Sequence, residues 1–147
     1  MKIEPFYRTA LYYETDKMAV VHHSNYIRWL EEARIDFLNQ VGLPYDEMEK
    51  NGIMIPVLSV SCQYKYAVKF NETVCIKSKM EDFSGLKFKI SYHITDKETG
   101  DLRVTAESSH FFVDSNFKPI RIKNVNPHIY DVFNGLVGVD LYTDFIK

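Results

Sequence analysis

The spacing of apolar residues changes abruptly near Pro56, and this change constrains the fold more than any other feature of the sequence. Before Pro56, apolar side chains recur at steps of three and four, which is the spacing of one face of an α-helix. After it they alternate with polar side chains, which is the spacing of half-buried β-strands. A long helix followed by strands predicts an α+β domain in which the helix covers one apolar face of a sheet.

The helical segment follows Ser24 and Asn25, whose side chains are suited to cap a helix start. We expect an amphipathic helix of about four turns that ends at Gly42, because Pro44 prevents continuation. A short second helix is expected over residues 45–50. The buried face of the long helix would carry Tyr26, Leu30, Ala33, Phe37 and Val41, with Ile27, Arg34 and Leu38 on its flank.

One strand is expected before the helix and four after it, joined by short turns that favour antiparallel pairing of consecutive strands. Cys62 and Cys75 would then lie on paired strands with their thiols on opposite faces, so no disulfide is expected between them. Residues 119–122 are a candidate extension of the sheet edge. Asn126 and Pro127 predict a C-terminal helix that ends near Gly135. The expected strands cover residues 6–13, 58–66, 74–80, 86–94 and 102–113.

Composition excludes several classes of protein. The 147 residues suit one domain over residues 1–147, and 46% hydrophobic with 26% charged residues predicts a packed globule. Eighteen basic against twenty acidic residues disfavour nucleic-acid binding. No apolar run approaches the ~20 residues of a membrane span and the N-terminus lacks a signal peptide, so the sequence predicts a soluble, cytoplasmic protein without stable membrane insertion. Ten Tyr, ten Phe and one Trp leave more aromatic surface than one small sheet can hide, which favours self-association.

The segment Tyr12–Arg34, YYETDKMAVVHHSNYIRWLEEAR, carries the functional signal. It resembles the signature of the hotdog-fold acyl-CoA thioesterases of the 4-hydroxybenzoyl-CoA thioesterase family, and within it the Tol-Pal-associated branch. The resemblance implies a hotdog fold: a long central helix wrapped by a five-stranded antiparallel sheet. It also implies homodimers or homotetramers with active sites at the dimer interface.

The same resemblance assigns site residues. Asp16 falls on the catalytic carboxylate, His23 on the position at the helix start that faces the thioester carbonyl, and Tyr12 on a functional tyrosine of the branch. Ala19 stands where the family has Gly in the substrate-binding loop, and Ala is costly there if a positive φ is required. Lys87 and Lys89 are candidates to bind the phosphates of coenzyme A. The implied substrate is a thioester of coenzyme A or of acyl carrier protein, with no cofactor and no metal.

These residues suit thioester hydrolysis on chemical grounds. An ionised Asp16 can activate water as a general base or attack the acyl carbon itself. The free N–H groups and dipole at the start of the helix can stabilise the oxyanion. The thiol departs as a thiolate, so a strong general acid is not essential. An ester or amide hydrolase needs more, and the chain has no Gly-x-Ser-x-Gly elbow.

Simpler roles compete with these assignments. Asp16 could be a turn residue that binds its own backbone, Tyr12 a core ring, and Lys87 and Lys89 part of an ordinary charged face. His22 and His23 are adjacent in an extended segment, so we expect their rings to point apart and to bind no metal. His110 is expected to be a hydrogen-bonded core histidine.

Two other functions stay open. A catalytically idle acyl-binding subunit of the same fold is suggested by Ala19 and opposed by the intact Asp16. A hotdog-fold dehydratase acting on a hydroxyacyl thioester would need a histidine base, for which only His23 or His110 could serve.

Overall fold

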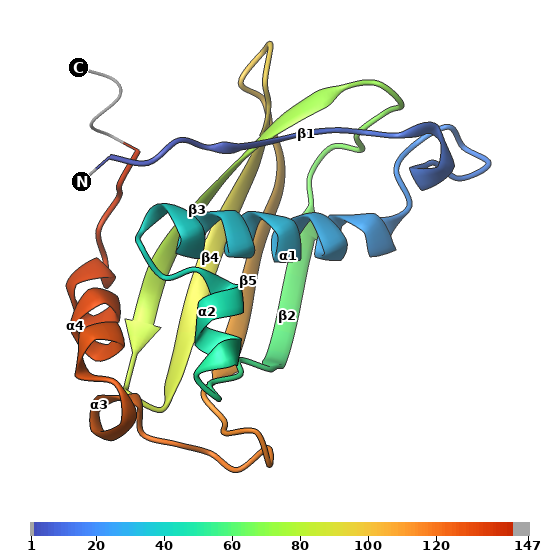
Figure 1. The fold of residues 1–147 in the computed structure, drawn as a ribbon. Coiled ribbons are helices and arrows are strands. Elements are labelled where there is room, and N and C mark those ends of the chain that lie inside the picture. Colours follow the sequence, from blue (N-terminus) through green and yellow to red (C-terminus); the bar gives the residue numbers. More distant parts are fainter. Residues whose placement is uncertain (1, 143–147) are drawn as a thin grey trace.

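The computed structural model describes residues 2–142 and has one five-stranded antiparallel sheet with helices on one side of it (Figure 1). The N-terminal part contributes β1 (Phe6–Thr9), the short 3₁₀ turn η1 (Tyr12–Glu14), α1 (His23–Gln40) and α2 (Tyr45–Lys50). The remaining elements are β2 (Val57–Tyr64), β3 (Thr73–Phe83), β4 (Lys87–Asp96), β5 (Leu102–Phe111), α3 (Ile122–Val125) and α4 (Pro127–Leu136).

The strand order is β1-β3-β4-β5-β2, and it corrects one prediction. β3, β4 and β5 follow one another through short turns and pair as expected. β2 does not pair with β3. It pairs with β5 at the far edge of the sheet, because the segment between Tyr64 and Thr73 crosses over rather than turning back. Cys62 and Cys75 are therefore not on neighbouring strands, and both are free thiols.

α1 lies across one face of the sheet, with β1 running beside it (Figure 1). Its first residue is His23 and its N-cap is His22, two or three residues earlier than the cap expected at Ser24 or Asn25. The expected apolar face is buried, and the fully buried Trp29 joins it. Arg34 and Leu38 on the flank are buried as well, whereas Ile27 is 40% exposed.

The C-terminal part confirms one expectation and corrects another. Asn126 caps α4 by accepting the Ile129 N–H, and Pro127 occupies its first turn. Residues 119–122 do not extend the sheet edge: Pro119 forms only an isolated bridge with Val113, and Ile122 begins α3. Cys75, expected on the polar face of its strand, is buried where β3 pairs with β1, opposite Tyr7.

No helix among residues 2–142 is both long and apolar enough to cross a membrane.

Candidate active site

The chain between η1 and α1 folds into a small hairpin that projects beyond the sheet (Figure 1). The Asp16 N–H donates to the Val20 carbonyl at 2.9 Å, and the His22 N–H donates to the Glu14 carbonyl at 2.8 Å. At the tip, the Ala19 N–H donates to the Asp16 carbonyl at 3.0 Å. The tight turn from Asp16 to Ala19 ends in a left-handed residue, as common three-residue hairpin loops do.

Ala19 is that left-handed residue, with φ of +63°. A positive φ is the condition under which Ala was expected to be costly at the position where the family has Gly. The hairpin forms with Ala19 in this strained conformation. The cost of a left-handed L-residue is about 1–2 kcal/mol.

The Asp16 side chain takes part in the turn. Its Oδ1 accepts the Met18 N–H at 2.8 Å, which is the backbone contact expected of a simple turn aspartate. Its other oxygen has no hydrogen-bond partner among residues 2–142, and the side chain is only half-buried. One carboxylate oxygen is thus held by the loop while the second is available to water or substrate.

The first turn of α1 faces the same loop. His22 caps the helix, its Nδ1 accepting the Ser24 N–H at 3.2 Å, and the following N–H groups carry the positive end of the helix dipole. The rings of His22 and His23 lie against each other, with centroids 4.2 Å apart. The prediction that they point apart is wrong, because a helix begins between them. No cluster of three potential metal ligands occurs in the described part of the chain.

Asp16 and the helix start lie on the two arms of the hairpin. Thr15 on the first arm pairs with Val21 on the second. His23 follows Val21 by two residues, so the rise of an extended chain places Asp16 roughly 10 Å from His23. Burial raises the pKa of the Tyr26 hydroxyl on α1; the Val68 amide and Arg103 act against it, and the charges of Glu72 and Asp16 add to it. The structure therefore brings Tyr12, Asp16, Ala19 and His23 together in one loop region.

Glu14 anchors this loop and was missed by the sequence reasoning. Its side chain is 3% exposed, and its carboxylate accepts the Trp29 indole N–H at 3.0 Å and two N–H groups of Arg8 at 3.0 Å each. Burial works to raise the pKa of Glu14, but the bonds from the Leu11 amide, Trp29 and Arg8 outweigh it and lower the pKa. The only sequence signal was an acidic residue two places before Asp16.

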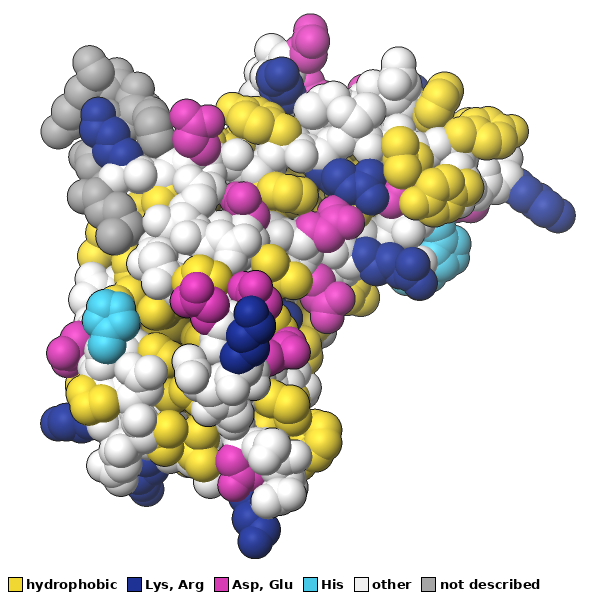
Figure 2. Space-filling model, viewed as in Figure 1, with side chains coloured by type: hydrophobic (Ala, Val, Ile, Leu, Met, Phe, Trp, Pro, Cys, Tyr) yellow, Lys and Arg dark blue, Asp and Glu magenta, His cyan; other side chains and the backbone are white. Residues whose placement is uncertain are grey.

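The neighbourhood of the helix start is aromatic. Tyr12 is 77% exposed and packs edge-on against Phe70, so its assignment as a core ring is wrong. The Tyr64 hydroxyl lies 3.5 Å from the His23 carbonyl, and its ring lies 5.1 Å from that of Tyr26. Burial raises the pKa of Tyr64 to about 12. Figure 2 shows hydrophobic side chains gathered on this projecting end of the molecule.

Lys87 and Lys89 lie at the opposite end of the sheet. They lie at the start of β4. The other end of β4 is near the hairpin that carries Asp16: Asp96 there pairs with Arg103, close to the segment in which Lys69 bridges to Val20. The length of the strand separates the two lysines from that end by roughly 25 Å. Within one chain the structure does not bring them to Asp16.

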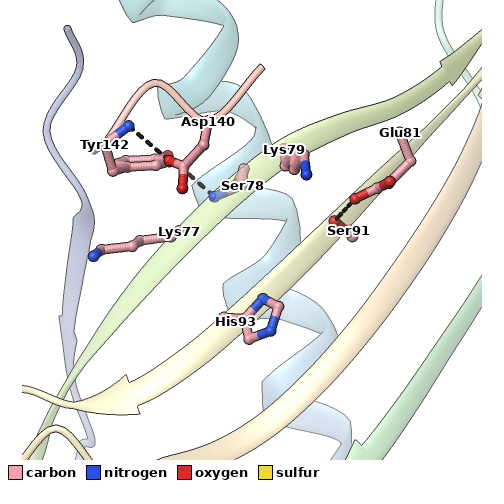
Figure 3. A pocket seen from close by; sticks show the side chains of 8 residues that line it. All are labelled: Lys77, Ser78, Lys79, Glu81, Ser91, His93, Asp140 and Tyr142. Carbon is pink, nitrogen blue, oxygen red and sulfur yellow. Dashed lines mark hydrogen bonds between the residues drawn. The ribbon is translucent and has the colours of Figure 1, made fainter. Parts of the chain in front are cut away.

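Basic residues also gather on the outer face of the sheet, around a cavity of about 330 Å³ (Figure 3). Lys77 and Lys79 share it with carboxylates, and Glu81 there binds the Ser91 hydroxyl at 2.8 Å. This mixed charge does not form a distinct anion site.

Comparison with known proteins identifies the class. Residues 11–133 match the thioesterase-like superfamily, and the chain belongs to it. It is 38% identical over 117 residues to the "Putative acyl-CoA thioesterase YneP" of Bacillus subtilis, covering 79% of this chain and 84% of the relative. A "Putative esterase" of Aquifex aeolicus is 35% identical over 78% of this chain and 88% of its own.

Solved structures agree. A DHNA-CoA thioesterase from Staphylococcus aureus superposes with a TM-score of 0.86 at 34% identity, over 90% of this chain and 89% of its own. The protein is thus an enzyme of the thioesterase class with the hotdog fold.

Proposed function

We propose that this protein hydrolyses acyl-CoA thioesters to a free acid and coenzyme A, with Asp16 as general base or nucleophile. The observation that carries the proposal is the hairpin that fixes Asp16 and the first turn of α1 on its two arms. The relatives described as acyl-CoA and DHNA-CoA thioesterases support the substrate class. The motif from Tyr12 to Arg34 supports a place in the 4-hydroxybenzoyl-CoA thioesterase family, near its Tol-Pal-associated branch.

In the general-base route, Asp16 takes a proton from water as the water oxygen bonds to the thioester carbon. The carbonyl oxygen becomes an oxyanion that the N–H groups at the start of α1, near His23, stabilise. Collapse of this intermediate breaks the carbon–sulfur bond and releases the thiolate. In the nucleophilic route, Asp16 forms an anhydride that water then opens. Tyr12 is placed to orient the water or the substrate.

A dimer joined through β2 completes the proposed site. β2 lies at the sheet edge, and Val57, Leu58 and Tyr64 on it are 40%, 47% and 47% exposed. An exposed edge strand with apolar side chains is a natural pairing site for a second copy. Pairing there would cover the surface beside Tyr64 and the helix start. Binding of the coenzyme A phosphates by Lys87 and Lys89 stays a prediction. It requires that a second subunit place its lysines near Asp16 of the first.

The chain contains a matched control for the test of Asp16. Asp114 makes the same turn: its N–H donates to the Lys118 carbonyl, its Oδ1 accepts the Asn116 N–H at 2.8 Å, and the left-handed residue is Phe117 with φ of +62°. Thiol release from a panel of acyl-CoA thioesters is measured for wild type, Asp16→Asn and Asp114→Asn. We expect Asp16→Asn to lower kcat by roughly 10²–10⁴. Asp114→Asn should leave kcat near that of the wild type.

Equal turnover by Asp16→Asn and wild type would refute the role of Asp16. No thiol release from any acyl-CoA by the wild type would favour the idle acyl-binding subunit. Water loss from a 3-hydroxyacyl-CoA would favour the dehydratase. Burial lowers the pKa of His110 to about 3 and Ser108 binds its ring, which makes His110 a poor base for that reaction.

A further inference from the structure

A cavity of about 240 Å³ lies between α1 and the sheet, outside the loop that holds Asp16. Ile27, Leu30, Val57 and Val60 give it mostly apolar walls, and Tyr92 closes its floor. The cavity starts one turn after the first residue of α1 and follows the helix to Arg34. It therefore begins one helical turn beyond the proposed oxyanion site, along the same helix.

Arg34 supplies an unpaired charge to this cavity. It is 5% exposed, and its Nη1 has no hydrogen-bond partner within residues 2–142. None of the ion pairs in the described chain includes Arg34. Its guanidinium lies 5.9 Å from the Tyr45 ring, a contact that leaves its charge uncompensated. A buried guanidinium without a carboxylate is costly, so the site suits an anion.

His110 adds a second polar atom. It is 1% exposed and lines the same cavity. Its Nδ1 makes no hydrogen bond of normal geometry with the described residues, although the Pro56 backbone lies close enough to act on the pKa of the ring. Its Nε2 lies 2.7 Å from the Ser108 hydroxyl, which lies 2.7 Å from the Tyr92 hydroxyl. If each hydroxyl donates toward the imidazole, Nε2 accepts and Nδ1 carries the proton. The burial of the ring and the nearby Arg34 charge both lower its pKa, so the ring is neutral.

We propose that this cavity binds a carboxylate at the far end of the acyl chain, held by Arg34 Nη1 and His110 Nδ1. One positive charge and two N–H donors match the single charge and two oxygens of a carboxylate. The apolar walls match the methylene chain that would precede it. The proposal rests on the proposed function, because it takes the carbonyl end of the same acyl group to lie at the start of α1.

The distance along α1 from His23 to Arg34 sets the length of the acyl chain that we expect. His23 and Arg34 are separated by about 16 Å along α1, at 1.5 Å per residue. Arginine side chains in a helix lean toward its N-terminus, which shortens the gap. An extended chain with bonds near 1.5 Å and angles near 111° then spans it with roughly six to twelve carbons.

The test compares two thioesters of equal chain length, an ω-carboxyacyl-CoA and the methyl-ended acyl-CoA. The ratio of their kcat/KM values is measured for wild type, Arg34→Met, Arg34→Lys and Glu31→Gln, across that range of lengths. We expect wild type to prefer the ω-carboxy substrate, and Arg34→Met to lower the ratio roughly tenfold to 100-fold. Arg34→Lys should restore part of the ratio, because it keeps the charge and loses the fork of donors.

Glu31 provides a control with the opposite expected effect from that of Arg34. It lies on the cavity rim, exposed, and its negative charge opposes an anion entering there. Glu31→Gln should therefore raise the preference for the ω-carboxy substrate. Loss of a buried unpaired charge should also leave Arg34→Met folded, with a melting temperature no lower than that of wild type.

Each outcome separates the two proposals. A wild type that hydrolyses both substrates with no preference, or prefers a hydroxyaryl acyl group to every ω-carboxyacyl group, overturns the carboxylate site and leaves the thioesterase intact. A preference that survives Arg34→Met also overturns it. Should neither substrate be hydrolysed, thermal shift with free dicarboxylates decides: stabilisation of wild type but not of Arg34→Met keeps the site, and equal shifts reject it.

Discussion

The indole N–H of Trp29 donates to Glu14 Oε2 at 3.0 Å, and this bond ties the hairpin that carries Asp16 to α1. Arg8 on β1 holds the same carboxylate from the other side. The Glu14 carbonyl also accepts the side-chain amide of Asn25 at 2.9 Å. The position of Asp16 relative to the start of α1 thus depends on the buried carboxylate of Glu14.

Replacing Glu14 by Gln should destabilise the fold. The change removes the buried one of the two carboxylates that pair with Arg8, and we expect the free energy of unfolding to fall by about 3 kcal/mol. Urea denaturation measures it. Glu32 is the matched control, because it also binds Arg8, at 2.9 Å, but its side chain is 43% exposed. Glu32→Gln should cost less than about 1 kcal/mol, and equal losses for both variants would contradict the anchoring role.

Ala19→Gly should stabilise the protein. Glycine adopts a positive φ without the steric cost that Ala pays at +63°. Part of this gain is lost to the greater freedom of glycine in the unfolded chain, so we expect about 0.5–1 kcal/mol in urea denaturation. Phe117→Gly tests the same turn position in the second hairpin and should shift stability in the same direction. A loss of stability in Ala19→Gly would show that the methyl group makes favourable contacts.

His110 should make stability depend on pH between about 7 and 5. Burial, together with the charge of Arg34, lowers its folded-state pKa from 6.5 to about 3. As the pH falls through 6.5 the unfolded chain takes up a proton that the folded protein does not, so stability falls. At pH 5 this residue should cost about 2 kcal/mol relative to pH 7.

Urea denaturation at both pH values checks this expectation. His110→Gln should remove the loss, whereas His93→Gln, an exposed histidine on β4, should keep it. The same pH dependence in wild type and His110→Gln would assign the loss to other groups.

Leu58→Lys should weaken self-association through the β2 edge. Leu58 lies at a bulge of β2 and is 47% exposed, and a charged residue on an edge strand opposes pairing with a second copy. Sedimentation analysis should show a dimer for wild type and a shift toward monomer for the variant. Val125→Lys changes a similarly exposed apolar residue on α3, 52% exposed, and should leave the dimer intact. A monomeric wild type would refute the proposed assembly.

Local features of this protein followed from the sequence because they depend on neighbouring residues. The helical spacing from Tyr26 to Val41 located α1, and Asn126 with Pro127 located the start of α4. The predicted pairing of β2 with β3 is wrong. The short spacing from Tyr64 to Thr73 resembles a hairpin, but strand order depends on where the crossover after Tyr64 can pack. His22 was not expected as the N-cap of α1. Its Nδ1 can accept the Ser24 N–H only when the chain turns into the helix at His23.

The sequence by itself determined the α+β class, the family motif and the placement of Asp16 just before a helix start, since each is a matter of residue type and spacing. Only the tertiary structure decided that Glu14 is buried between Arg8 and Trp29, and that Arg34 and His110 face one cavity. These groups lie on elements far apart in the chain. Burial and unpaired charge arise only when the sheet closes against α1, so no local pattern of residues records them.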